Sequence, residues 1–161
     1  MFERFKQRSH ELERLDTGDY TDAEYAHWQK EMRFIHRLWG EMRALRNSLF
    51  RDLSGEIGHV SILDVGAGSG ELLRELKKWF GGRASLTGVE INETAARSFK
   101  SGGIAAVLAD GLRLPFETDS FDAVFCSLFL HHLSDDDAPR LLAEMARVSR
   151  GRIYAIDLNR D

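Results

Sequence analysis

The chain lacks several features that would take it outside the ordinary globular proteins. Its 161 residues include one cysteine and two prolines, and the net charge is −4 at pH 7. A single cysteine, Cys126, excludes an internal disulfide framework and any multi-cysteine metal site, which suits a reducing cytosol. The small negative charge provides no general attraction to nucleic acid or to an anionic membrane surface.

Long apolar segments are also missing. The longest apolar run, Ala123 to Leu130, is far too short to cross a bilayer. The N-terminus is charged throughout and has no apolar core like that of a signal peptide. We therefore expect a soluble cytoplasmic protein with no membrane span and no nucleic acid among its partners.

The first fifty residues contain no proline and predict helices. Thr21 and Glu24 have the spacing of a capping box, and Tyr20 and Tyr25 are placed to form a hydrophobic staple across the same helix start. Gly40 is expected to bend or break the helical segment. One face of this segment is apolar, with Met32, Ile35, Leu38, Trp39, Met42, Leu45 and Leu49 at helical spacing. We predict a separate N-terminal segment, residues 1–52, which is either a packing layer on the next domain or a lid over a ligand site.

From residue 60 onward, short apolar strands alternate with helices. The predicted strands are Val60–Val65, Ala84–Ile91, Ile104–Ala109, Phe121–Leu128 and Arg152–Leu158. The predicted helices are Ser69–Phe80, Glu93–Lys100 and Ser134–Val148. Such alternation predicts parallel pairing with right-handed crossovers. We therefore expect an α/β fold over residues 53–161, a Rossmann-like doubly wound parallel sheet.

Three glycines, Gly66, Gly68 and Gly70, stand at every second position between the first strand and the next helix, in LDVGAGSGELL. In a doubly wound sheet, ligands bind beyond the carboxyl ends of the strands, where the strand order reverses, and this loop belongs there. Glycine lets a ligand approach the backbone closely, although the same residues also suit a turn that is simply tight. The sequence alone leaves both roles open.

Three carboxylates follow strand ends on the same rim. Asp64 precedes the glycines, Glu90 ends the second strand, and Asp110 ends the third. Together they would repel a polyphosphate and suit a ligand that carries positive charge. The G-x-G-x-G spacing also differs from the dinucleotide pattern, so a nicotinamide-linked oxidoreductase is disfavoured. Three alternatives remain: Asp64 as a cap on the turn, Glu90 as a solvated charge and Asp110 as a turn residue only.

Four segments together resemble a known family. They are LDVGAGSG, GVEIN, LADGLRLPFETDSFDAVFCSLFLHHL and EMARVSRGRIYAIDL. They resemble the class I S-adenosylmethionine-dependent methyltransferases, in particular the branch of ubiquinone/menaquinone-type small-molecule methyltransferases. The resemblance implies S-adenosyl-L-methionine as cofactor and S-adenosyl-L-homocysteine as product. It also implies a small-molecule acceptor, methylated on an O, C or N nucleophile by in-line displacement.

The resemblance assigns one set of residues to the methionyl half of the cofactor. Gly66, Ala67, Gly68 and Gly70 would cradle the methionyl part, and Asp64 would favour its ammonium group.

A second set would hold the nucleoside half. Glu90 would bind the ribose hydroxyls, and Ile91 would pack on the adenine face. Asp110 would accept a hydrogen bond from the adenine amino group, with Gly111 and Leu112 lining that pocket.

The acceptor side follows the fourth strand. Ser127 and Leu128 would lie beneath the methionyl and sulfonium region. His131 or His132 could remove a proton from a phenol, enol or amine as the methyl group transfers, or the pair could only pack the short helix. Adjacent histidines lack metal-ligand spacing, so no metal is expected. We expect Cys126 to be a buried small hydrophobe rather than a nucleophile.

The chain departs from the family in length. The resemblance implies seven strands, and five are present before the sequence stops at Asp161. The fifth strand would then be an exposed edge, a pairing hazard that proteins normally cover. Three explanations compete: truncation, which we favour, an edge covered by a partner or by a second copy in a homodimer, or a minimal variant. The missing strands also favour an alternative function, a cofactor-binding or partner-binding module without turnover.

Overall fold

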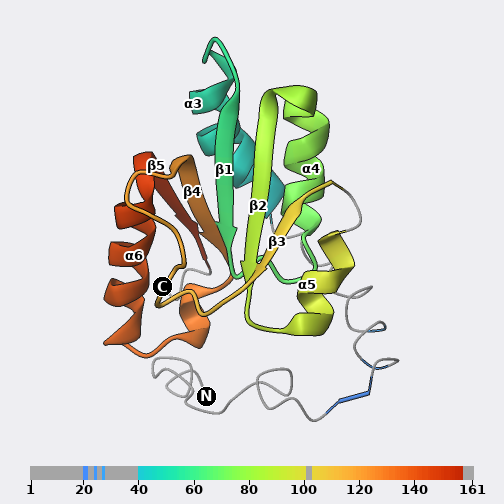
Figure 1. The fold of residues 1–161 in the computed structure, drawn as a ribbon, viewed down its shortest axis with the longest axis vertical. Helices are drawn as coiled ribbons and strands as arrows, with labels where there is room; N and C mark the ends of the chain where they lie inside the picture. The colour runs from blue at the N-terminus through green and yellow to red at the C-terminus, as the bar shows by residue number, and fades with distance from the viewer. Residues whose placement is uncertain (1–19, 22–23, 25–26, 28–39, 101–102, 158–161) are drawn as a thin grey trace, which may run out of the picture.

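The computed structural model describes residues 20–21, 24, 27, 40–100 and 103–157, which form a parallel sheet flanked by helices (Figure 1). The strand order is β3-β2-β1-β4-β5, so it reverses between β1 and β4. Every neighbouring pair is parallel. The strands are β1 (Val60–Val65), β2 (Ala84–Glu90), β3 (Ala105–Leu108), β4 (Phe121–Ser127) and β5 (Ser149–Ile156). The predicted Rossmann-like sheet of five strands is confirmed.

Helices cover both faces of this sheet. The helical elements are α2 (Glu41–Leu45), the π-helical η2 (Arg46–Phe50), α3 (Arg51–Ser54), α4 (Glu71–Phe80), the 3₁₀ turn η3 (Gly81–Arg83), α5 (Glu93–Lys100), the 3₁₀ turn η4 (Leu130–His132) and α6 (Asp137–Val148). The run from α2 to α3 packs on one face together with α4 and α5, and α6 packs on the other. Figure 1 shows α4 and α5 on the side of the sheet away from α6.

Each face of the sheet buries its own apolar core. Strand alternation sends Ile62 and Phe125 to the face where Leu45 of α2 packs. It sends Leu63 to the opposite face, where Met145 of α6 packs. Parallel strands buried on both sides read as continuous apolar runs, which explains why β4 shows no alternation in its sequence.

The ends of the elements were harder to predict than the elements themselves. Helix α4 begins at Glu71 rather than at Ser69, because Gly70 adopts the left-handed conformation with φ +74° and precedes the first helical residue. Strand β5 begins at Ser149 rather than at Arg152, because α6 runs directly into it without a loop. The predicted end of that strand, Leu158, lies outside the described residues.

The predicted capping box at the N-terminal helix start is confirmed. The Thr21 amide donates to Glu24 Oε2 at 2.8 Å, and the Glu24 amide donates to Thr21 Oγ1 at 3.3 Å, which is a capping box. Gly40 interrupts the helical pattern with φ +82°, and α2 begins directly after it. Tyr25 and the apolar positions 32, 35, 38 and 39 lie outside the described residues.

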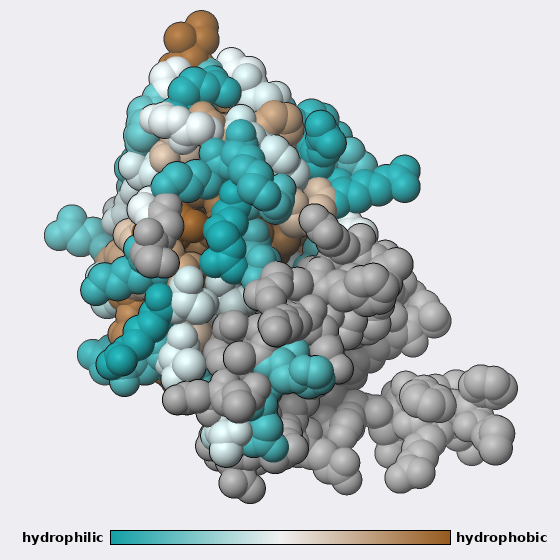
Figure 2. Space-filling model, turned by 90° about the vertical axis from the view of Figure 1, so that its right-hand side faces the viewer, coloured by the Kyte–Doolittle hydropathy of each residue, from teal (hydrophilic) through white to brown (hydrophobic). Residues whose placement is uncertain are grey.

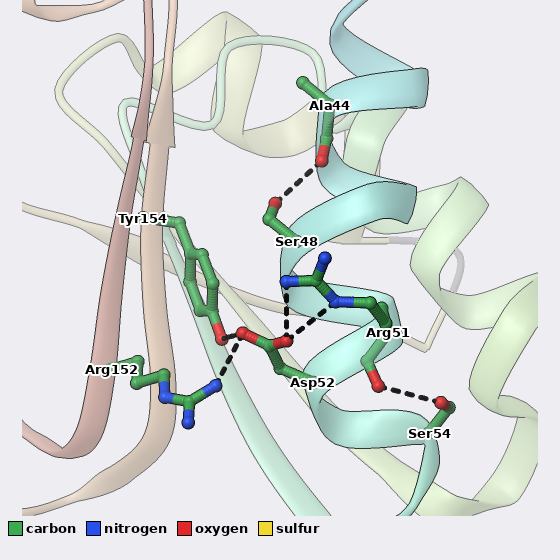
Figure 3. Close-up of polar contacts among 7 residues, drawn as sticks. All are labelled: Ala44, Ser48, Arg51, Asp52, Ser54, Arg152 and Tyr154. Carbon is green, nitrogen blue, oxygen red and sulfur yellow. Dashed lines mark hydrogen bonds and ion pairs between the residues drawn. The ribbon is translucent and has the colours of Figure 1, made fainter.

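Asp52 of α3 links the helices α2 to α3 to strand β5 (Figure 3). Its Oδ2 accepts hydrogen bonds from Arg152 Nη1 at 2.7 Å and from the Tyr154 hydroxyl at 3.1 Å, both on β5. Its Oδ1 accepts a hydrogen bond from Arg51 Nε at 3.1 Å. Burial alone would raise the pKa of Asp52, but the hydrogen bonds from Arg152, Arg51 and Tyr154 outweigh burial and lower it. An ionised Asp52 therefore links α3 to β5 at neutral pH.

Apolar surface is sparse on the side of the molecule formed by α4 and α5. Figure 2 shows mostly hydrophilic and neutral residues there, with hydrophobic surface confined to small patches. No helix in the described part of the chain is long and apolar enough to cross a membrane. Among the described residues, β5 pairs with β4 alone, so its other edge has no strand beside it.

Candidate cofactor-binding site

The loop between β1 and α4 holds its three glycines at positive φ, +75° at Gly66, +53° at Gly68 and +74° at Gly70. A Cβ on Gly66 would lie 2.8 Å from Phe129 Cγ, and a Cβ on Gly70 would lie 2.4 Å from Phe99 Cβ. A Cβ on Gly68 would meet no atom within 4 Å. Two of the glycines are therefore required by packing, whereas the backbone at Gly68 borders open space that a ligand could approach.

The side chain of Glu90 accepts a hydrogen bond from this loop. Its Oε2 accepts a hydrogen bond from the Gly68 amide at 2.8 Å, and its Oε1 accepts one from the Asn92 amide at 2.9 Å. Burial raises the pKa of Glu90, and the hydrogen bonds from these backbone amides partly offset that increase. Glu90 is thus not a solvated loop charge. Each of its oxygens still has a lone pair for a further donor.

The amides of the turn do not use Asp64 as a cap. Those of Gly66 and Ala67 both donate to Val89 O at 3.0 Å, and the following amide donates to Glu90. The alternative in which Asp64 only caps the turn is therefore wrong for these amides.

Asp64 is instead a buried carboxyl group near two other acidic side chains. Its residue is 2% exposed. Burial raises the pKa of Asp64 well above its ordinary value, and the charges of Glu90 and Glu41 raise it further. Among the described residues, no basic side chain contributes to this shift. A positive charge placed here would favour ionisation of Asp64, because opposite charges stabilise the charged form.

Strand β4 ends beside Asp64. The register pairs Asp64 with Phe125, and Ser127 lies two residues farther along β4. Ser127 is 9% exposed, and its Oγ has no hydrogen-bond partner within the described residues. A buried hydroxyl without a partner is costly, so this atom indicates a position where a ligand or a water supplies one. Leu128 follows with φ +48°, and its amide donates to Ile156 O at 2.8 Å.

The residues predicted for the adenine pocket follow β2 and β3 on the same edge of the sheet. Ile91 directly follows β2 and is 72% exposed. Asp110 is exposed, and its Oδ1 accepts a hydrogen bond from the Leu112 amide at 2.9 Å, which is a turn contact. Gly111 is buried, and a Cβ there would lie 3.0 Å from Val65 Cγ1. The structure thus gives Asp110 a turn role, and its role toward adenine stays a prediction.

The histidine pair lies in η4, and His131 is bonded to a partner that the sequence analysis missed. His131 Nδ1 lies 2.8 Å from Asp157 Oδ1, and the His131 amide donates to Asp157 Oδ2 at 3.1 Å. The ring of the exposed His132 lies beside it, with centroids 4.1 Å apart. Asp157 directly follows β5, so its position at a strand end was the signal that could have found it.

Other chemistry is poorly supported at this edge. Cys126 is buried in β4, and burial together with the charges of Asp64 and Asp157 raises the pKa of its thiol to about 12, so it stays a neutral thiol. Within the described residues, no group of three or more His, Cys, Asp or Glu side chains is arranged to hold a metal ion.

Comparison with known proteins identifies the family of this chain. A family model described as a methyltransferase domain matches residues 62–152, more than half of the chain. The chain is 28% identical over 136 residues to the ubiquinone/menaquinone biosynthesis C-methyltransferase of Hahella chejuensis, covering 78% of this chain and 51% of that protein. It is 34% identical over 122 residues to cycloartenol-C-24-methyltransferase 1 of Oryza sativa, covering 67% of this chain and 34% of that protein. The chain thus spans about half the length of the curated bacterial relatives it matches.

Solved structures share the fold. The SAM-dependent methyltransferase from Thermotoga maritima superposes with a TM-score of 0.60 at 22% identity, covering 81% of this chain and 55% of that one. The SAM-dependent methyltransferase from Aquifex aeolicus gives a TM-score of 0.58 at 18% identity, covering 76% of this chain and 73% of that one. The open glycine loop, the acidic surrounding of Asp64 and the match over residues 62–152 lead to one conclusion: the chain belongs to the class I S-adenosylmethionine-dependent methyltransferases, and S-adenosylmethionine is the cofactor of that family.

Proposed function

We propose that this chain transfers a methyl group from S-adenosylmethionine to an O, C or N nucleophile of a small molecule by in-line displacement. The observation that carries the proposal is the buried Asp64 beside the open backbone of Gly68. Glu90 and Glu41 add negative charge to this region, so a ligand with positive charge offsets the carboxylates. When bound, the cofactor supplies a methyl group activated by its sulfonium.

Different residues near the strand ends bind different parts of the cofactor. Asp64 and the bare backbone at Gly68 receive the methionyl part. Glu90 uses its remaining lone pairs for the ribose hydroxyls, since two backbone amides already hold its carboxylate in place. Ile91 directly follows β2 and is exposed, so it can cover an adenine face. We assign the adenine amino group to Asp110, two residues beyond β3, as an acceptor besides its turn contact with the Leu112 amide.

His131 is the general base of the proposed reaction. The 2.8 Å contact with Asp157 orients the ring through Nδ1 and leaves Nε2 as the nitrogen that accepts a proton from the acceptor. A carboxylate behind a histidine also stabilises the imidazolium that forms when the proton is taken. Asp157 is therefore a positioning residue, and His132, which lies beside the ring of His131, completes the acceptor side.

The curated relatives suggest which acceptors to test first. Both relatives named above are C-methyltransferases. A base at His131 suits a phenol or enol, because removing the hydroxyl proton makes the adjacent ring carbon or the oxygen nucleophilic. Phenolic and enolic compounds are thus the first acceptors, followed by amines.

The test has two stages. Calorimetric titration with S-adenosylmethionine should show binding, and NADH titrated in parallel should show none. Radiolabelled methyl transfer to a panel of phenols, enols and amines should then yield S-adenosylhomocysteine in equal amount with methylated product. Binding without transfer to any acceptor would favour a binding module without turnover. Absence of any heat or thermal stabilisation by S-adenosylmethionine would overturn the proposal.

A further inference from the structure

A buried glutamate outside the predicted motifs lies on the same side of the sheet as Asp64. Glu41 is the first residue of α2, directly after Gly40, and it is 3% exposed. Glu41 lies one helical turn before Leu45, and Leu45 packs in the same core as Ile62, which is two residues before Asp64 on β1. In agreement with this placement, the charge of Glu41 contributes to the raised pKa of Asp64. Helix α2 packs on the sheet, and it contacts β5. Glutamate is rarely buried so fully unless it is paired, so burial by itself does not assign Glu41 to a ligand.

Strand alternation places Glu41 on the correct face of the sheet. Asp64 shares a face with Ile62, and Ser127 shares one with Phe125, because residues two apart along a strand point the same way. Ile62 and Phe125 pack in the core that includes Leu45 of α2. Asp64 and Ser127 therefore point toward the layer that contains Glu41.

Ser127 is an independent indication that a ligand belongs here. Its Oγ is buried and has no hydrogen-bond partner within the described residues. It lies at the carboxyl end of β4, two residues beyond the partner of Asp64 in the sheet. A ligand with an ammonium group would supply the missing partner, since an ammonium donates up to three hydrogen bonds.

We propose that Glu41 and Asp64 form a two-carboxylate subsite for the ammonium group of S-adenosylmethionine, with the Ser127 hydroxyl as its third polar group. The inference rests on the proposed function and deepens it. It makes α2 part of the cofactor site rather than a packing layer alone. Glu90 holds the nucleoside half separately, so this subsite decides how strongly the chain prefers the cofactor to a bare nucleoside.

The test compares three probes by calorimetric titration. S-adenosylmethionine has the ammonium and the sulfonium, S-adenosylhomocysteine retains only the ammonium, and 5′-methylthioadenosine has neither. The Glu41→Gln substitution removes one negative charge and keeps the shape. It should weaken S-adenosylmethionine about tenfold, or about 1.4 kcal/mol. The loss should be similar for S-adenosylhomocysteine, which keeps the ammonium group, and absent for 5′-methylthioadenosine, which lacks it.

Glu56→Gln is the matched control, because Glu56 is exposed just beyond α3 and the net charge changes equally. It should bind all three probes as the unmodified chain does. Equal weakening of all three probes by Glu41→Gln, or no weakening of S-adenosylmethionine, would overturn the inference. If the unmodified chain binds none of the probes, it is the proposed function that fails.

A measurement on the unmodified chain keeps the inference testable if Glu41→Gln does not fold. The charged groups that act on Asp64 are Glu41 from α2 and Glu90 from β2. The nearby Cys126 thiol lies on the opposite face of the sheet and stays neutral, because burial and nearby carboxylates raise its pKa to about 12. Since the pKa of Asp64 is raised in the free chain, a cation must displace its proton. Affinity for S-adenosylmethionine should therefore rise with pH more steeply than affinity for 5′-methylthioadenosine. Parallel pH profiles for the two probes would overturn the inference.

Discussion

Replacing single glycines by alanine should separate the packing role of the loop from its binding role. Gly68 and Gly70 both have positive φ, +53° and +74°, so either alanine costs about 1–2 kcal/mol of backbone strain. At Gly70 the new Cβ also lies 2.4 Å from Phe99 Cβ, and such overpacking adds about 1–3 kcal/mol. At Gly68 the new Cβ meets nothing within 4 Å.

These costs convert to melting temperatures. For a chain of this size, 1 kcal/mol lowers Tm by about 2–4 °C. Gly68→Ala should therefore lower Tm by about 4 °C and Gly70→Ala by about 10 °C, measured without ligand by thermal unfolding. Gly68→Ala should nevertheless lose at least about tenfold in affinity for S-adenosylmethionine by calorimetric titration, because its methyl group occupies the open approach to the backbone.

Gly81 offers a matched control for strain without binding. It has φ +58° and open space for a Cβ, but it lies at the other end of α4 from the glycine loop. Gly81→Ala should cost at least as much stability as Gly68→Ala, because its ψ of −134° lies outside the left-handed helical region, and it should leave cofactor affinity unchanged. The reasoning is refuted if Gly68→Ala binds S-adenosylmethionine as tightly as Gly81→Ala does, or if Gly70→Ala melts no lower than Gly68→Ala.

The other predictions concern catalysis, acid stability and thiol reactivity. His131→Gln should slow methyl transfer about 100-fold and Asp157→Asn about tenfold, with calorimetric affinity for S-adenosylmethionine unchanged; a parallel loss of affinity would indicate a structural role instead. Hydrogen bonds from Arg147 lower the pKa of Glu144 from 4.5 to about 2, so their stabilisation is complete above pH 4.5 and is lost as the pH falls toward 2. Allowing for solvent screening, Glu144→Gln should lower the free energy of unfolding by about 1–2 kcal/mol at pH 7. In urea titrations, the substituted chain should also lose less stability than the unmodified chain as the pH falls. An unchanged pH dependence would contradict this. Cys126 should resist alkylation in the folded chain and react once urea unfolds it; rapid labelling of the folded chain would show that the thiol is accessible.

The positions of the residues expected to bind the cofactor could be predicted because they lie at or near strand ends; their role toward the cofactor stays a prediction. Asp64 lies one residue before the end of β1, Glu90 ends β2 and Asp110 lies two residues beyond β3, and parallel strands bring their carboxyl ends to one edge. The strands themselves were recognisable from apolar runs such as Phe121–Ser127. Local signals therefore sufficed for the sheet and for its acidic rim.

Contacts between distant segments could not be predicted in this way. His131 and Asp157 are 26 residues apart, and no periodicity connects them. Glu41 lies in a different element from Asp64, and only the packing of α2 on the sheet brings them into range. The helix start at Glu71 was also missed, because the sequence does not show that Gly70 adopts the left-handed conformation that precedes the first helical residue.

The sequence by itself determined the α/β alternation, the glycine loop and the order of charged strand ends, because each depends on neighbours along the chain. The tertiary structure alone decided which glycine borders open space, which histidine has a carboxylate partner and which helix adds a third acidic group. The physical reason is that hydrophobic burial fixes the sheet from a local pattern, whereas the environment of one side chain is set by whatever the fold packs against it.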